Sequence, residues 1–147
     1  MRLIAYLNFD GQCRAAFDLY REVLRGEIVS RSTYGESPMR DEIPAEGRDR
    51  IMHCHLQIGD ATLMGADGPP PHTADGQGTC VNIDVDSIEE AERIFAALSE
   101  GGTVQMPLHE TFWAHRWGAF VDRFGKPWMV NCMKPMSEIE AAGEAAP

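Results

Sequence analysis

The chain has 147 residues and a formal net charge of −10, and 44% of its residues are hydrophobic. This size and balance fit one globular domain, or one domain built from two similar halves. Lysine occurs only as Lys126 and Lys134, so no basic surface is expected and nucleic-acid partners are disfavoured. No apolar run reaches the ~18 residues of a membrane span, and the first residues lack the apolar stretch of a secretion signal. We therefore expect a cytoplasmic protein with no membrane partner.

The first half of the chain predicts a strand, a helix and three further strands. Apolar residues alternate over 3–9 and then recur at helical spacing over 10–24, where Gly26 is expected to stop the helix. The elements that follow are a strand over 27–34, a polar loop over 35–50, and a hairpin of strands 51–59 and 61–67 that turns at Gly59-Asp60.

The same order of elements restarts after residues 68–78, which are rich in proline and glycine and are interpreted as a linker. A strand over 79–85 precedes a helix over 86–102, which Asp86 or Ser87 can cap. The remaining elements are an extended segment over 103–113, a hairpin of 115–125 and 126–134 around Phe124-Gly125, and a small, acidic segment over 135–147 that predicts a flexible tail.

A shift of 75 residues (95 − 20) superimposes the two helices and places Tyr20 on Phe95. Because the elements before and after the helices also match in order, we interpret the chain as a duplication. The predicted fold class is α+β, with two βαβββ modules over 1–67 and 79–134 that together form one domain. Each sheet has one hydrophobic face that needs a partner, so the two modules are expected to enclose a cleft.

Three segments carry a resemblance to a known family: "YLNFDGQCRAAFDLYREVL", "IMHCHLQIGDATLM" and "EGGTVQMPLHETFWAHRWGAFVDRFGKPWMVNC". They resemble the PhnB-like branch of the vicinal oxygen chelate superfamily, which includes glyoxalase I, bleomycin-resistance proteins and extradiol dioxygenases. The resemblance implies that the paired modules form a curved eight-stranded mixed sheet with a cleft, the glyoxalase/bleomycin-resistance-like fold, commonly in a homodimer.

Some PhnB-like proteins carry the name 3-demethylubiquinone-9 3-methyltransferase. A methyltransferase that uses S-adenosylmethionine normally shows a glycine-rich turn after a strand, with an acidic residue further on. The chain has no G-x-G-x-G segment. Methyl transfer is therefore the disfavoured alternative.

The superfamily's metal-dependent members place a His or Glu on the first and last strands of each half, and such side chains suit a divalent ion with open positions for substrate oxygens. None of the residues at these positions is a His or a carboxylate, so we predict that the inherited metal site is absent and that no cofactor is held. The positions fall on Ala5 or Tyr6, Cys80, Leu63 or Met64, and Met129, with Asn82 and Asn131 nearby.

A different metal site remains open at His53 and His55, which lie two apart on a predicted strand and so share a face. With His109 or His115 they could form a cluster for a divalent metal. The alternative interpretation is that both are hydrogen-bonded polar residues of a half-exposed sheet. His53 is also a weak catalytic candidate.

Two carboxylates flank the aromatic segment. Glu110 could act as a general base, while Asp122 could act as an acid or could instead fix the turn over 122–127 through backbone amides. The cysteines show no CxxC pair, so most are expected to be reduced and buried rather than ligands or nucleophiles. The four are Cys13, Cys54, Cys80 and Cys132.

Phe112, Trp113, Trp117 and Trp128 are either core residues or the wall of a pocket. Large aromatic side chains with a few polar partners typically line small-molecule sites. Arg116 is a candidate partner for an anion, or else part of a salt bridge.

The leading hypothesis is a homodimeric, metal-free protein that binds a small organic molecule. The candidate contacts are Tyr6, Asn8, His53, His55, Met64, Asn82, Trp113, Arg116, Trp117, Met129 and Asn131. The alternative from another class is an enzyme. It would be a metal-dependent lyase, isomerase or dioxygenase that uses His53 and His55, or a metal-free acid–base catalyst that uses Glu110.

Overall fold

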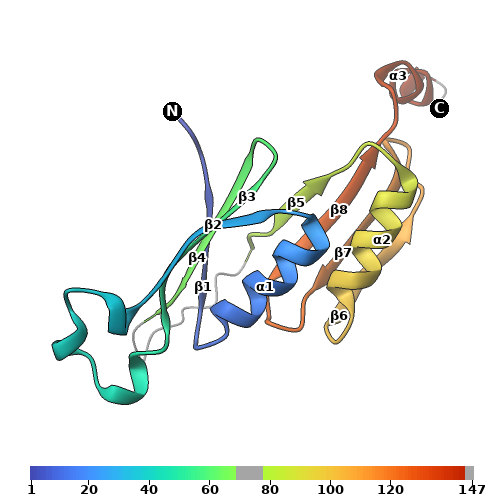
Figure 1. Cartoon of the computed structure of the whole chain (residues 1–147). Helices are drawn as coiled ribbons and strands as arrows, with labels where there is room; N and C mark the ends of the chain where they lie inside the picture. Colours follow the sequence, from blue (N-terminus) through green and yellow to red (C-terminus); the bar gives the residue numbers. More distant parts are fainter. Residues whose placement is uncertain (69–77, 145–147) are drawn as a thin grey trace. The chain divides into compact units, whose positions relative to one another are not determined.

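The computed structural model describes residues 1–68 and 78–144 (Figure 1). The chain divides into two units, Met1–Gln77 and Gly78–Pro147, and the boundary falls inside the segment predicted as a linker. The linker itself and the end of the acidic tail lie largely outside the described residues. That the two modules make one domain and enclose a cleft stays a prediction.

The first unit contains the elements β1 (Ala5–Phe9), α1 (Cys13–Leu24), β2 (Glu27–Thr33), β3 (Ile51–Ile58) and β4 (Ala61–Asp67). Three short 3-10 turns occupy the predicted polar loop: η1 (Tyr34–Glu36), η2 (Arg40–Glu42) and η3 (Ala45–Gly47). The second unit contains β5 (Val81–Asp84), α2 (Ile88–Ser99), β6 (Thr103–His109), β7 (Ala114–Val121), β8 (Pro127–Met133) and α3 (Met136–Glu144).

Each unit builds one four-stranded mixed sheet with the same topology. The strand order is β1-β4-β3-β2 in the first and β5-β8-β7-β6 in the second. The pair formed by the first and last strand of each unit is parallel, and the other pairs are antiparallel. The α+β class and the repeated βαβββ order predicted from the sequence are therefore confirmed. In the described residues, the eight strands form two hydrogen-bonded sheets of four.

One helix covers one face of each sheet. Helix α1 packs on β3 and β4, and α2 packs across β7 and β8 (Figure 1). The helices bury their apolar sides, including Phe17 and Tyr20 of α1 and Phe95 of α2. Phe95 meets the ring of Phe120 edge to face at 5.1 Å between centroids. The other face of each sheet is not covered by its own helix, and we call it the helix-free face.

The end of α1 differs from the expectation. Arg25, not Gly26, takes the left-handed conformation that ends the helix, with φ of 54°. Gly26 is needed for a different reason, because a Cβ there would lie 2.7 Å from the backbone oxygen of Gln57. Of the two residues predicted to cap α2, Ser87 is the cap in the structure, and its hydroxyl accepts a hydrogen bond from Glu90 N at 3.2 Å.

The acidic segment after residue 134 also differs from the expectation of an irregular tail, because α3 forms over Met136–Glu144. The segment is rich in alanine and glutamate, which are strong helix formers, and its first turn follows Pro135. Met136 is 61% exposed. None of the helices among residues 1–68 and 78–144 has the length and apolar character that crossing a bilayer requires.

Candidate functional site

A row of four side chains crosses the helix-free face of the second sheet. Asp84 on β5 pairs with Asn131 on β8, Asn131 pairs with Trp117 on β7, and Trp117 pairs with His109 on β6. Strand alternation turns the neighbouring Gly118 toward α2, where its Cβ position lies 2.6 Å from the ring of Phe95. Trp117 and its row partners therefore point away from α2.

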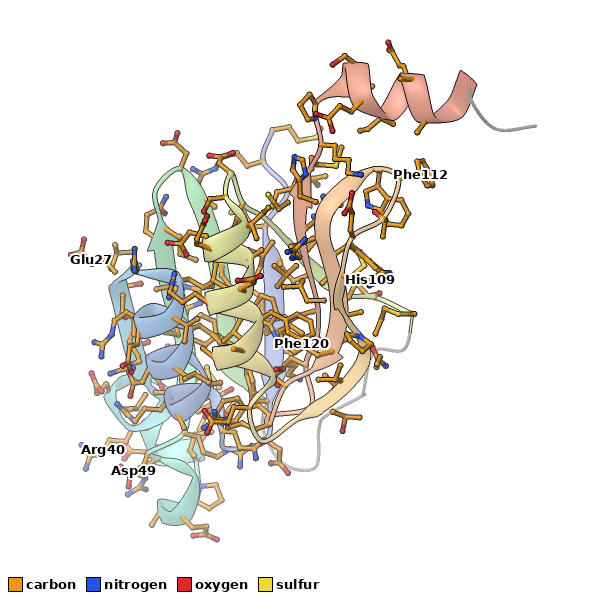
Figure 2. The ribbon with its side chains drawn as sticks, turned by 90° about the vertical axis from the view of Figure 1, so that its right-hand side faces the viewer. Glu27, Arg40, Asp49, His109, Phe112 and Phe120 are labelled. Carbon is orange, nitrogen blue, oxygen red and sulfur yellow. The ribbon has the colours of Figure 1, made fainter. Side chains whose placement is uncertain are left out.

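Figure 2 shows this separation. His109 lies on the side of β6 and β7 away from α2, and Phe112 lies further along the same side, whereas Phe120 lies between the sheet and α2. The two faces of this sheet thus carry different kinds of side chain. One face holds the core under α2, and the other carries aromatic and polar side chains together.

Four rings form a continuous aromatic row on this face: His109, Trp117, Trp113 and Phe112. Successive ring centroids are 5.8, 5.7 and 5.0 Å apart, and each pair meets edge to face. Edge-to-face contacts of this kind fix ring orientation. Phe112 ends the row with 63% of its surface exposed.

The turn that joins β6 to β7 holds the far end of the aromatic row in place. Thr111 N donates to Ala114 O at 3.0 Å, and Ala114 N donates back to the Thr111 hydroxyl at 3.0 Å. Lys134 N, just after β8, donates to Trp113 O at 2.8 Å. The backbone of Trp113 is therefore tied to two strands of the sheet, and its ring is presented on a rigid support.

The row that crosses the sheet from His109 through Trp117 is polar at its other end, where Asn131 and Asp84 lie. The Asn131 amide nitrogen donates to Asp84 Oδ1 at 2.8 Å, and the Asn82 amide nitrogen lies 3.5 Å from the same oxygen. Asn131 is only 7% exposed, and its side-chain oxygen is buried with no hydrogen-bond partner among the described residues. Such an oxygen costs free energy unless a donor reaches it.

The helix-free face of the first sheet carries a second polar set. The register places Tyr6 beside Met64 and Met64 beside His55, and Asn8 follows two residues after Tyr6. The Tyr6 hydroxyl and His53 Nδ1 are 3.0 Å apart, and burial raises the pKa of the Tyr6 phenol above its ordinary value. His55 Nε2 lies 3.2 Å from the Gln57 side-chain oxygen instead of facing His53.

The registers also show the surroundings of the positions at which the sequence predicts the missing metal ligands. Tyr6 faces Met64 in the first parallel pair, and Asn82 faces Met129 in the second. Cys80, the position predicted from the sequence, directly precedes β5, which begins at Val81. A phenol, an amide and two thioethers do not fit a divalent ion that prefers imidazole and carboxylate ligands.

The two histidines of β3 do not extend into a larger cluster. Within residues 1–68 and 78–144, no group of three or more His, Cys, Asp or Glu side chains is placed to hold a metal ion. His53 and His55 instead have Tyr6 and Gln57 as neighbours at hydrogen-bond distance. Whether the chain lacks a metal in solution stays a prediction.

The structure does not bring Arg116 together with the tryptophans. Its guanidinium lies 3.4 Å from Glu92 of α2 and donates to the carbonyl of His115 at 2.6 Å. Strand alternation explains this, because Arg116 precedes Trp117 on β7 and therefore points to the helix-covered face. Of the two interpretations left open, the structure shows the salt bridge.

Glu110 is paired with Lys134 at 2.7 Å. The hydrogen bond and the positive charge of Lys134 lower the pKa of the Glu110 carboxyl. A carboxylate that holds its proton less tightly is a weaker base, which argues against general-base chemistry by Glu110.

Asp122 takes the structural role that was one of its two interpretations. Its Oδ1 accepts from the backbone N–H groups of Phe124 and Lys126, both at 2.9 Å, and its Oδ2 accepts from Trp128 Nε1 at 2.9 Å. Trp128 is 1% exposed under α2 and so belongs to the core, unlike the two tryptophans of the aromatic row.

All four cysteines are free, and only Cys80 is exposed. Burial raises the thiol pKa of Cys13 and of Cys132, and it raises the pKa of Cys54 to about 11. Thiols held protonated are poor nucleophiles and poor metal ligands. The expectation that most cysteines are buried is confirmed.

The sequence did not lead us to predict Asp84 as a site residue, and it suggested His109 only as a possible metal ligand. Both belong to the row that contains Trp117 and Asn131. A signal for Asp84 was present, because it lies two residues after the candidate Asn82 on a strand and therefore shares its face. No comparable signal placed His109 opposite Trp117, since a register shift in β6 sets that pairing.

Comparison with solved structures first defines the fold class. The chain is similar to a fosfomycin resistance protein, FosX, from Mesorhizobium loti, at 12% identity with a TM-score of 0.60 over 95% of this chain and 97% of that one. It is also similar to a glyoxylase/bleomycin resistance protein/dioxygenase domain from Frankia, at 13% identity with a TM-score of 0.60 over 90% and 95%. The chain therefore has the glyoxalase/bleomycin-resistance fold.

More similar relatives then define the family. The family model described as 3-demethylubiquinone-9 3-methyltransferase matches residues 1–131, and the chain belongs to this PhnB-like family. Protein YjdN from Escherichia coli (strain K12) is 33% identical over 142 residues, which cover 91% of this chain and 97% of YjdN. The crystal structure of protein PA1353 from Pseudomonas aeruginosa is 44% identical, with a TM-score of 0.84 over 92% of this chain and 99% of that one.

Proposed function

We propose that the chain binds a small organic molecule with an aromatic ring on the helix-free face of the sheet β5–β8, and that it does so without a metal ion. The observation that carries the proposal is the aromatic row of His109, Trp117, Trp113 and Phe112. Trp117 of this row is the register neighbour of Asn131, whose buried side-chain oxygen has no hydrogen-bond partner among the described residues. Rings with a few convergent polar groups are typical of ligand sites.

The donor set supports the metal-free form of the proposal. The positions predicted for metal ligands lie at or beside Tyr6, Met64, Asn82 and Met129, and none of these is a His or a carboxylate. The Tyr6–His53 pair and the nearby Asn8 and His55 are the part of the candidate set that lies in the first unit. We propose that these side chains of the first unit serve as polar contacts for a small molecule and not as metal ligands.

The test uses Nile red, a neutral aromatic dye whose emission rises in an apolar site. Stacking on Trp117 should make the wild-type chain enhance and shift the dye emission, and Trp117→Ala should lower the apparent affinity by about tenfold, in line with the loss of one good aromatic contact. Val104→Ala is the matched control, because Val104 is an exposed apolar residue that pairs with Phe120 on the other face. Equal affinity in the wild type and both variants would contradict the proposal.

An enzyme with a metal site, or a methyltransferase as the family description suggests, is the competing function. Metal analysis of protein purified without chelators tests the first, and a stoichiometric divalent metal would contradict the metal-free proposal. Calorimetry with S-adenosylmethionine tests the second, and saturable heat would favour methyl transfer. We expect neither, because the metal positions lack suitable donors and the chain has no glycine-rich cofactor turn.

We also propose that the protein is a cytoplasmic homodimer. Its four free cysteines are typical of a reducing compartment. Exposed apolar side chains gather where β8 leads into α3, and these are Met133 at 46% and Met136 at 61% exposure. Apolar side chains left in solvent in this way are typical of surfaces that a second copy covers.

A further inference from the structure

We propose that the ligand of the helix-free face of β5–β8 is an organic cation, a protonated amine with an aromatic ring, whose ammonium group is held by Asp84. The inference rests on the proposed function and adds the chemical class of the ligand. It starts from the hydrogen-bonding character of the row that runs from Asp84 through Asn131 to Trp117.

The polar end of the row offers acceptors. Asp84 provides a carboxylate, and Asn131 provides a buried side-chain oxygen without a partner among the described residues. The amide N–H groups of Asn131 and Asn82 are turned to Asp84 Oδ1, at 2.8 and 3.5 Å. A ligand that docks here therefore needs to donate hydrogen bonds, and an ammonium group does so without accepting any.

The charge of Asp84 is not offset by a cation in the described part of the chain, since both of its donors there are neutral amides. Four cationic side chains of the second unit are paired with other carboxylates. Arg93 pairs with Glu90, Arg116 with Glu92, Arg123 with Glu100 and Lys134 with Glu110.

The aromatic row favours the same charge. The indole faces of Trp117 and Trp113 are the best side-chain partners for a cation, and Trp117 is adjacent to the Asn131 position in the register. An anion would instead meet the carboxylate of Asp84 and the negative faces of the rings. The chain's net charge of −10 adds a long-range attraction for cations.

The test compares three probes that share a naphthalene ring and differ in charge at pH 7: 2-naphthylmethylammonium, 2-naphthalenemethanol and 2-naphthoate. Equilibrium dialysis in 0.15 M NaCl limits the effect of the overall charge. We expect the cation to bind about tenfold more tightly than the neutral alcohol, as an ion pair combined with a cation–π contact allows, and the anion to bind most weakly.

Asp84→Asn keeps the size of the side chain and removes the charge. The variant should therefore bind the cation and the alcohol with about equal affinity. Glu89→Gln is the matched control, because it removes one exposed charge from α2 on the other face and should leave the preference unchanged.

The outcomes separate the two proposals. Equal binding of the three probes by the wild type overturns the cation inference and leaves the proposed function standing, and so does an unchanged preference in Asp84→Asn. Binding of none of the probes, together with no response to Nile red, overturns both. If Asp84→Asn does not fold, the ranking of the probes by the wild type still decides the inference.

Discussion

At the scale of single residues, each unit contains one buried aspartate that holds its local structure together: Asp67 in the first unit and Asp122 in the second. Asp67, at the end of β4, accepts from the backbone N–H groups of Cys13 and Ile51 at 3.0 and 2.8 Å. It thereby ties the start of α1 to the start of β3. Asp122 accepts two backbone N–H groups and the Trp128 indole N–H instead, so it ties the β7–β8 turn to the core. Charged hydrogen bonds of this kind are among the stronger ones.

Asp122→Ala should destabilise the protein by about 2–4 kcal/mol, because it removes a buried carboxylate and leaves the Trp128 indole N–H without its acceptor. Urea unfolding followed by tryptophan fluorescence measures the change. Asp60→Ala, in the exposed turn between β3 and β4, is the control and should stay within about 0.5 kcal/mol of the wild type. A loss of less than 1 kcal/mol in Asp122→Ala would show that the turn does not depend on these bonds.

At the scale of elements, each helix packs through an aromatic ring onto a glycine of the sheet beneath it. A Cβ at Gly65 would lie 2.6 Å from the ring of Phe17, and a Cβ at Gly118 would lie 2.6 Å from the ring of Phe95. The missing side chains let α1 and α2 approach their sheets closely. The contact is of the same kind in both units but lies on different strands, because Gly65 is on β4 and Gly118 is on β7.

Gly118→Ala should destabilise the protein by about 1–3 kcal/mol, because the added methyl group forces Phe95 or the sheet to move. The double variant with Phe95→Leu should recover part of the loss, and this recovery identifies the ring as the cause. Gly143→Ala, in α3 with open space around the added Cβ, should change the stability by no more than about 1 kcal/mol. Urea unfolding measures all three, and an unchanged midpoint in Gly118→Ala would refute the packing argument.

At the scale of the whole molecule, the two units share one topology but carry different helix-free faces. The first is polar around Tyr6, His53 and His55, and the second is aromatic around Trp113 and Trp117. The two units therefore share a framework, while the residues that do not face a helix differ between them. Members of one fold class commonly differ in this way, because function resides in the side chains that the framework presents.

We expect the protein to be a dimer in solution, with twice the 16.3 kDa mass of the chain in sedimentation velocity at micromolar concentration. Met136→Asp should shift the population toward the monomer, because a charge on an apolar contact is costly to bury. Met39→Asp is the control, since Met39 is 46% exposed in the first unit, away from α3 in the sequence. A monomer at every concentration would contradict the dimer, and an equal shift in both variants would contradict the assigned surface.

The sequence predicted most of the fold because the signals are local. Alternation and helical spacing place every strand and both long helices within a few residues, and the glycine turns set both hairpins. The helix over Met136–Glu144 was missed because its composition was judged by charge and small residues and not by helix propensity. The left-handed conformation of Arg25 was missed because Gly26 was expected to end the helix. Gly26 is instead required by the close approach of β3 at Gln57.

By itself, the sequence predicted the family and the repeated modules, and both predictions are confirmed. The tertiary structure alone decided which candidates share a face. It joined Asp84, Asn131, Trp117 and His109 in one row, and it turned Arg116 toward Glu92. The physical reason is that the pairing register between strands distant in the chain fixes these neighbours, and local patterns carry little information about it.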